Sequence, residues 1–278
     1  RGLDFGLYSA AEFGDLPAFE EYAEKKPEKL NAALPTKVCP IHNAALNNQL
    51  AIVKFLVEHG VPITSQECDY GSPLRIALRN NYFEMADYLL SKGADINENG
   101  KPPEGSTILT DVIGHENLKA AQYILDHRGL INKTDFNGNT PMHEAARQGK
   151  LAAAQFLWEH GAALGNKNKD GSTPLHMAVW AQQIDIVKYL VANGADIMSR
   201  DTKRRPPLHL AIAQKNLPIF NFLLANGAEA TFKDKQGQSV LHKAAAMGLV
   251  DWIPNILDHG ALINEADNDG QTPLHIAV

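Results

Sequence analysis

The stretch that decides the fold is Asp135-Phe136-Asn137-Gly138-Asn139-Thr140-Pro141-Met142-His143, because its last two residues begin a series. An apolar residue followed by His recurs every 33 residues, at Leu175-His176, Leu208-His209, Leu241-His242 and Leu274-His275. We call the position of this histidine the His slot. Counting backwards from His143, the slot holds Thr110, Arg75, His42 and Tyr8, at intervals of 33, 35, 33 and 34 residues. A period of this length indicates a repeat protein, whose units pack against their neighbours.

Each repeat predicts a tight turn followed by a short helix. Asp135 and Gly138 favour the turn, Thr140 can cap the helix, and Pro141 suits its first turn. Gly149 then predicts the end of this first helix.

A second helix follows in each repeat. In one repeat its apolar residues have helical spacing, with Ile186-Val187 one turn before Leu190-Val191. It is predicted to end at Gly194-Ala195-Asp196, where glycine accepts the left-handed conformation.

These patterns resemble the ankyrin repeat family. The resemblance rests on Thr-Pro-Leu-His at 173–176 and 272–275 and on Gly-Ala-Asp at 93–95 and 194–196, and it extends over the whole chain. It implies an all-α solenoid of helix-turn-helix units with short, β-hairpin-like turns, which we call fingers. We expect a single domain over residues 1–278, with units near 1–35, 36–66, 67–101, 102–134, 135–167, 168–200, 201–233, 234–266 and an incomplete 267–278.

Four departures from the pattern predict local irregularity. Thr107–Thr110 and Ser239–His242 lack the proline, and Lys203–Pro207 lacks the turn glycine. Pro254 falls inside a second helix, where it should delay or kink that helix.

Composition restricts the function. The net charge of -6 and the pI near 6.0 argue against broad nucleic-acid binding. No apolar run approaches the ~20 residues that span a membrane. Cys39 and Cys68 form no Cys-x-x-Cys pair, which favours reduced thiols in the cytoplasm. A nuclear location, through Lys203–Arg205, and delivery into a host cell as a pathogen effector are the alternatives.

No catalytic or metal site is predicted, and no cofactor. Six of the eleven histidines occupy the His slot. In the ankyrin repeat family, which this chain resembles, the histidine at this position makes structural hydrogen bonds. Four more, His59, His127, His160 and His259, stand near the ends of second helices, where an imidazole suits the helix dipole. Only His115 is left over. Asn166–Gly171 imitates a calcium loop, but Met177 stands where that loop requires Glu.

The resemblance implies a partner on the concave face, which the fingers and first helices form. Exposed positions there are expected four and five residues after the His slot, and among them Trp180 is the strongest candidate anchor. The alternative is that the Trp180 side chain is buried against a neighbouring finger and binds no partner. Arg147 and Met247 occupy equivalent positions, and Phe136 and Tyr70 lie at finger tips.

Charge is concentrated in three successive fingers. The stretches 166–171, 200–206 and 233–238 hold eight bases against three acids. We expect Lys169, Lys203, Arg205 and Lys235 to form a basic stripe that steers an acidic partner. The alternative is that these bases only form a solvated surface and steer no partner.

The sequence therefore predicts a protein-binding module without an active site of its own. The alternative is the targeting or regulatory arm of a multidomain enzyme or of a pathogen effector. The chain ends inside the first helix of a ninth unit, so we expect the natural protein to continue beyond Val278. The oligomeric state is not predicted. The candidate partner-binding residues are Phe136, Arg147, Trp180, Lys169, Lys203, Arg205, Lys235 and Met247.

Overall fold

The computed structural model describes residues 5–31, 39–64, 71–103 and 105–277. The finger-tip candidate Tyr70 and the thiol of Cys68 lie outside these residues. The chain divides into two compact units, the first ending at Phe136 and the second beginning at Asn137, which are described in turn.

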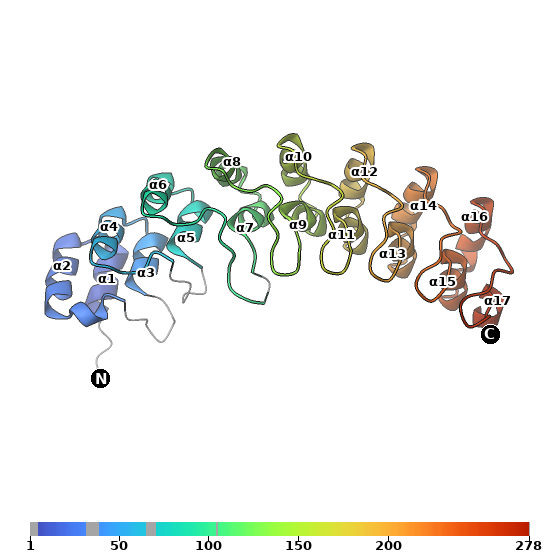
Figure 1. Ribbon diagram of the computed structural model, residues 1–278, viewed down its shortest axis with the longest axis horizontal. Helices are drawn as coiled ribbons and strands as arrows, with labels where there is room; N and C mark the ends of the chain where they lie inside the picture. Colours follow the sequence, from blue (N-terminus) through green and yellow to red (C-terminus); the bar gives the residue numbers. More distant parts are fainter. Residues whose placement is uncertain (1–4, 32–38, 65–70, 104, 278) are drawn as a thin grey trace. The chain divides into compact units, whose positions relative to one another are not determined.

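The first unit consists of helix pairs. Its first helices pack in a row, each against its own second helix and against the first helix of the next repeat (Figure 1). The pairs are α1 (Phe5–Phe13) with α2 (Leu16–Lys25), α3 (Pro40–Leu46) with α4 (Leu50–Glu58), α5 (Pro73–Arg79) with α6 (Phe83–Ser91), and α7 (Ile108–Gly114) with α8 (Leu118–Asp126). A 3-10 turn, η1 (Pro27–Lys29), follows α2.

The second unit repeats this arrangement. Its elements are α9 (Pro141–Gln148) and α10 (Leu151–Glu159), α11 (Pro174–Trp180) and α12 (Ile184–Ala192), α13 (Pro207–Ala213) and α14 (Leu217–Ala225), α15 (Val240–Ala246) and α16 (Ile253–Asp258), and α17 (Pro273–Ala277). In Figure 1 the fingers project from the side of the first helices. The predicted all-α helix-turn-helix solenoid is confirmed.

Pro254 has the predicted effect on the last complete pair. A 3-10 turn, η2 (Val250–Trp252), replaces the start of the second helix, and α16 begins only at Ile253. Pro254 then occupies the first turn of α16, where its missing N–H breaks no helical hydrogen bond.

Small residues allow the close packing of the first helices. Ala145, Ala146 and Ala178 are fully buried where α9 and α11 meet. The second helices supply larger apolar side chains, such as Val187 and Leu190, which are also fully buried. The core therefore lies between the two helix layers and continues from repeat to repeat.

The fingers of the second unit are hairpins closed by an aspartate or asparagine. In one of them Asp201 N–H donates to Arg205 O at 3.1 Å, and the Asp201 carboxylate accepts from Lys203 N–H and Arg205 N–H. Asn168 makes the equivalent bonds in the preceding finger, so the stretch that imitates a calcium loop is a turn.

Backbone hydrogen bonds join each finger to the next. Lys169 N–H donates to Asn137 O, Thr202 N–H to Asp170 O, and Lys235 N–H to Lys203 O, each at 2.9 Å. Glycine is needed at this junction for two reasons. Gly171 has φ +72°, and a Cβ there would lie 2.8 Å from Thr202 N.

The His slot links each repeat to the finger that follows. His143, His176, His209 and His242 are buried, and each Nε2 lies 2.9–3.1 Å from a carbonyl oxygen of the next finger. In three of them Nδ1 lies 2.8–2.9 Å from the hydroxyl that caps the same helix. The structural role implied for these histidines is therefore observed.

The histidines outside the His slot cap helix ends. His59, His127, His160 and His259 place Nδ1 2.8 Å from the carbonyl oxygen one turn earlier. His115, which the sequence left unexplained, makes the same contact with Asp111 O at the end of α7.

The buried histidines predict a loss of stability in mild acid. Burial lowers the pKa of His176 and His209 below the usual 6.5, and the bonds to Arg205 O and Gln238 O oppose this shift only in part. The folded chain therefore binds fewer protons than the unfolded chain just below pH 6.5. Its free energy of unfolding should therefore fall as the pH is lowered through this range, by at most about 1.4 kcal/mol per pH unit for each histidine.

Urea unfolding between about pH 7.5 and about pH 5.5 measures this slope. The double variant His176→Gln/His209→Gln should have a smaller slope than the original chain. An equal slope in both proteins would contradict the assignment.

Candidate functional site

Two adjoining hollows open on the face of the second unit that the fingers and first helices form. The first, of about 620 Å³, contains Trp180, and the second, of about 490 Å³, is lined mainly by basic residues. We call them the Trp180 hollow and the basic hollow. Lys203 and Arg205 line both, so the two form one continuous site.

The Trp180 hollow has an apolar floor. Met177 and Trp180 reach it from α11, and Leu210 reaches it from α13. Trp180 is 55% exposed, as expected of an anchor on this face. Its binding role stays a prediction. The rim is polar, since it comes from fingers that include Asn139, Lys169 and Lys203.

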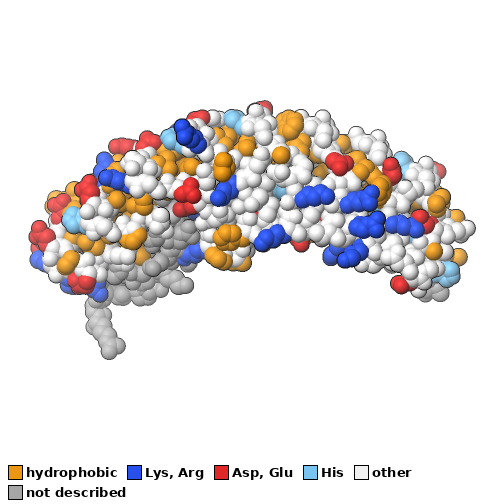
Figure 2. Space-filling model, in the orientation of Figure 1, with side chains coloured by type: hydrophobic (Ala, Val, Ile, Leu, Met, Phe, Trp, Pro, Cys, Tyr) orange, Lys and Arg blue, Asp and Glu red, His pale blue; other side chains and the backbone are white. Residues whose placement is uncertain are grey.

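The basic hollow is built from two fingers and one helix. Lys203 and Lys235 come from successive fingers, which the hydrogen bond from Lys235 N–H to Lys203 O holds side by side. Lys243 comes from α15, and the small side chain of Ala213 on α13 leaves the space open. In Figure 2 basic side chains gather over the part of the second unit that holds α13 and α15.

Buried carboxylates neutralise two of the bases. Arg205 Nη2 lies 2.7 Å from Asp201 Oδ2, and Lys243 Nζ lies 2.9 Å from Asp234 Oδ2. Burial acts to raise the pKa of Asp234, but the hydrogen bonds from Lys243 and from Gln238 N–H outweigh it and lower the pKa below 3.8. Asp234 therefore stays ionised at neutral pH.

Three bases of the predicted stripe remain unpaired. Lys169, Lys203 and Lys235 are exposed, and none of them has an acidic side chain within ion-pair distance among the residues that the structure describes. By contrast, Lys167 Nζ donates to Arg200 O and Lys233 Nζ lies 3.0 Å from Glu265. Fewer bases of these fingers are therefore available to a partner than the count of eight implies, and the binding role of the stripe stays a prediction.

The structure brings five of the eight candidate residues together. Trp180, Lys169, Lys203 and Arg205 line the Trp180 hollow, and Lys235 lines the basic hollow. The other three, Arg147, Met247 and Phe136, line neither of these hollows.

The outlying three have their own surroundings. Arg147 is exposed on α9 and forms an ion pair with Glu144 at 2.6 Å. Met247 is half-buried as the residue that ends α15. Phe136 belongs to the first unit.

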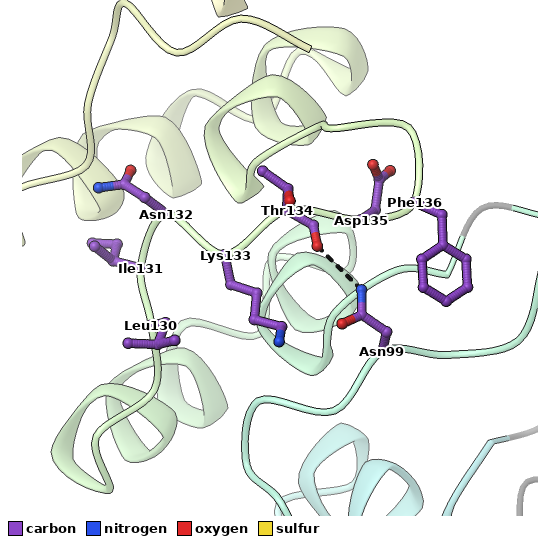
Figure 3. A pocket seen from close by; sticks show the side chains of 8 residues that line it. All are labelled: Asn99, Leu130, Ile131, Asn132, Lys133, Thr134, Asp135 and Phe136. Atoms are coloured by element: carbon purple, nitrogen blue, oxygen red, sulfur yellow. Dashed lines mark hydrogen bonds between the residues drawn. The ribbon is translucent and has the colours of Figure 1, made fainter. Parts of the chain in front are cut away.

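Phe136 borders a separate open hollow of about 700 Å³ in the first unit (Figure 3). Residues 130–136 and Asn99 line it, and Asn99 Nδ2 donates to Thr134 O at 3.1 Å. The Phe136 ring is 42% exposed and covers Gly105, where a Cβ would lie only 2.1 Å from it. Gly105 therefore leaves room for this ring.

Sequence reasoning missed Met177, Leu210 and Lys243. Each directly follows the His slot. This position is one helical turn before the position of Trp180, so it faces the fingers as well. Helical spacing could have identified these residues.

Comparison with known proteins identifies the repeats. A family model described as ankyrin repeats (3 copies) matches residues 7–100, 109–201 and 208–278. The chain belongs to the ankyrin repeat family. Within the described part of this ankyrin chain, no helix is both long enough and apolar enough to cross a membrane.

The similar proteins include an enzyme and a regulatory subunit. The chain is 30% identical over 148 residues to a putative palmitoyltransferase ZDHHC13 of Danio rerio, and 32% identical over 93 residues to protein phosphatase 1 regulatory subunit 27 of Mus musculus. It is 28% identical over 130 residues to an ankyrin repeat and KH domain-containing protein of Caenorhabditis briggsae. These matches cover 51%, 32% and 45% of this chain. They cover 22%, 60% and 5% of the relatives, so the chain spans less than two thirds of each.

The finger beside the basic hollow departs from the ankyrin pattern in a way that can be measured. Pro206 replaces the capping Thr or Ser, so it offers neither an N–H nor a hydroxyl, and the buried His209 Nδ1 has no hydrogen-bond partner among the residues that the structure describes. Pro206→Thr should restore both contacts, as Thr173 makes them to His176.

We expect Pro206→Thr to raise the free energy of unfolding by about 0.5–1 kcal/mol, since part of the gain is offset by a more flexible unfolded chain. Urea unfolding measures this change. The matched variant Thr173→Pro should lower stability. An unchanged or lower stability of Pro206→Thr would refute this account of His209.

Proposed function

We propose that the chain binds a partner protein through the Trp180 hollow and the basic hollow, and that the partner presents an acidic surface with an apolar residue. The exposed Trp180 within a concave, base-rimmed hollow carries this proposal. Membership of the ankyrin repeat family supports it, because these repeats are protein-interaction modules.

The hollow has the composition of a binding centre. An aromatic side chain surrounded by smaller apolar residues provides area that a partner can cover, and a polar rim excludes water around it. Trp180 would supply the aromatic surface, Met177 and Leu210 the apolar surroundings, and the finger residues the rim.

Charge would govern how fast and in which orientation the partner arrives. Lys169, Lys203 and Lys235 are exposed and unpaired among the described residues, so their field reaches the solvent. Unpaired surface charges raise association rates more than they raise affinity.

We propose no catalytic role for the chain itself. A second candidate is that it directs or regulates an enzyme carried by the same protein. The similarity to putative palmitoyltransferase ZDHHC13 supports this candidate, since the matched stretch covers only 22% of that relative. Both candidates use the same binding site.

The anchor role of Trp180 can be tested by affinity capture followed by binding measurements with the captured partner. Trp180→Ala should weaken binding by about thirtyfold, or about 2 kcal/mol, because a central aromatic residue is lost. The control is Trp158→Ala, which removes another exposed tryptophan from the second helix α10. Equal binding by the Trp180→Ala and Trp158→Ala variants would disprove the anchor role.

The role of charge predicts an effect on rate. Lys203→Glu/Lys235→Glu should slow association by about tenfold at low salt and weaken its dependence on salt. Lys119→Glu/Lys188→Glu changes the net charge equally but lies on second helices, and should leave the rate unchanged. Stopped-flow or surface plasmon resonance measures both, and an unaltered rate in the first variant would exclude steering by these lysines.

A further inference from the structure

We propose that the basic hollow binds a phosphate group, carried by a phosphorylated side chain of an extended peptide whose apolar residue lies against Trp180. This inference rests on the proposed function, because it identifies the kind of partner that the same site accepts. It goes beyond a general preference for acidic partners.

The charge of the hollow matches a phosphate ester better than a single carboxylate. Four cations line it, namely Lys203, Arg205, Lys235 and Lys243. Two of these cations are already paired with carboxylates: Lys243 with Asp234, which lines the hollow, and Arg205 with Asp201. An excess of two positive charges remains. A phosphorylated serine or threonine carries about −1.5 to −2 at neutral pH and would balance it.

Ammonium groups reach the basic hollow from two fingers and one helix. Lys203 and Lys235 extend from adjacent finger tips, while Lys243 approaches from α15. Lys243 is held in place by Asp234 at 2.9 Å and by Gln238 Oε1 at 2.5 Å, so little side-chain entropy remains to be lost on binding. Several lysines around one hollow suit a phosphate, which accepts hydrogen bonds on three oxygens.

The finger that carries Lys203 departs from the features that stabilise its neighbours. Arg204 has φ +59° at the position where the other fingers of this unit have Gly138, Gly171, Gly237 and Gly270. Pro206 leaves the buried His209 Nδ1 without a hydrogen-bond partner in the described part of the chain, and His209 itself borders the basic hollow. Backbone strain and unsatisfied polar groups gather at functional sites. Here both occur in the finger that contributes to both hollows.

The distance from Trp180 to Lys243 in the basic hollow sets the length of the ligand. Trp180 lies on α11 and Lys243 on α15, two repeats further along. Packed helices lie about 8–10 Å apart, so the two points are roughly 20 Å apart, which is about six residues of extended chain. The ligand is therefore a short linear segment with an apolar residue and a phosphorylated residue at roughly that spacing.

Two probes test the proposal on the full chain. The first is inorganic phosphate, titrated while the amide signals of the protein are followed by NMR. The second is a fluorescent library of peptides of about a dozen residues. Each carries one Leu and one phosphoserine at varied spacing, and is compared with the same sequence carrying Ser or Glu instead of phosphoserine.

We expect phosphate to shift the signals of Lys203, Lys235 and Lys243 before those of Lys188, which lies on the second helix α12. Phosphoserine peptides with the favoured spacing should bind at least about tenfold more tightly than their Ser and Glu versions. Lys203→Ala/Lys235→Ala should abolish that difference, whereas Lys188→Ala should retain it. Lys243→Gln should also reduce it. Because that variant leaves Asp234 uncompensated, the finger-tip double variant, which disturbs no buried pair, decides the outcome.

Equal affinity for the three peptide versions would overturn the proposal, and so would a preference for phosphoserine that survives in Lys203→Ala/Lys235→Ala. Binding to phosphatidylcholine vesicles that contain a phosphoinositide, without binding to phosphopeptides, would overturn it too, since the phosphate would then come from lipid. If phosphorylation has no effect but Trp180→Ala still abolishes capture of a protein partner, this inference fails while the proposed function stands. If Trp180→Ala changes nothing, the proposed function fails.

Discussion

The interaction on which the second unit depends is the hydrogen bond from a buried imidazole to the backbone of the following finger. His176 accepts at Nδ1 from the cap of its own helix and donates at Nε2 to Arg205 O, 3.0 Å away. It thereby fixes the start of one helix and the base of the next finger with one rigid ring. Burial keeps this ring neutral, and only a neutral imidazole can accept on one side and donate on the other. The rim of both hollows is therefore held in place from the core.

One repeat of the first unit makes the same link with different chemistry. Arg75 occupies the His slot, is buried, and donates from Nη2 to Ser106 O at 2.7 Å, which is the carbonyl just before the cap of α7. A buried guanidinium requires carboxylates, and Asp111 and Glu98 lie 3.4 and 4.0 Å from it. Burial in turn raises the pKa of Glu98, although Ser72 and Arg75 oppose the shift. A charged network thus does here what one neutral ring does in the second unit, at the risk of a large loss if either partner is removed.

The sequence was sufficient to locate the helices, because the turn residues and the period of 33 constrain the backbone locally. It also identified the delay at Pro254 and the exposed Trp180, both of which follow from single positions in the repeat. It could not decide which bases stay unpaired. Lys167 and Lys169 look alike in one finger, yet Lys167 donates a hydrogen bond to Arg200 O in the next repeat, while Lys169 stays on the rim of the Trp180 hollow. That choice depends on side-chain packing between repeats, which spacing along the chain does not contain.

The finger at 201–207 lacks two stabilising residues beside the proposed binding site. A glycine at 204 and a threonine at 206 would stabilise it, as the neighbouring fingers indicate. Arginine and proline stand there instead, beside the residues that both hollows share. Proline restricts the backbone just before α13, and arginine adds a cation to a finger whose aspartate already neutralises Arg205. The finger is nevertheless held, because backbone bonds from Thr202 to Asp170 O and from Lys235 to Lys203 O tie it to both neighbours. A solenoid can tolerate one weak finger for this reason: each repeat draws stability from the repeats on either side, so a departure from the stabilising pattern can persist beside the proposed binding site.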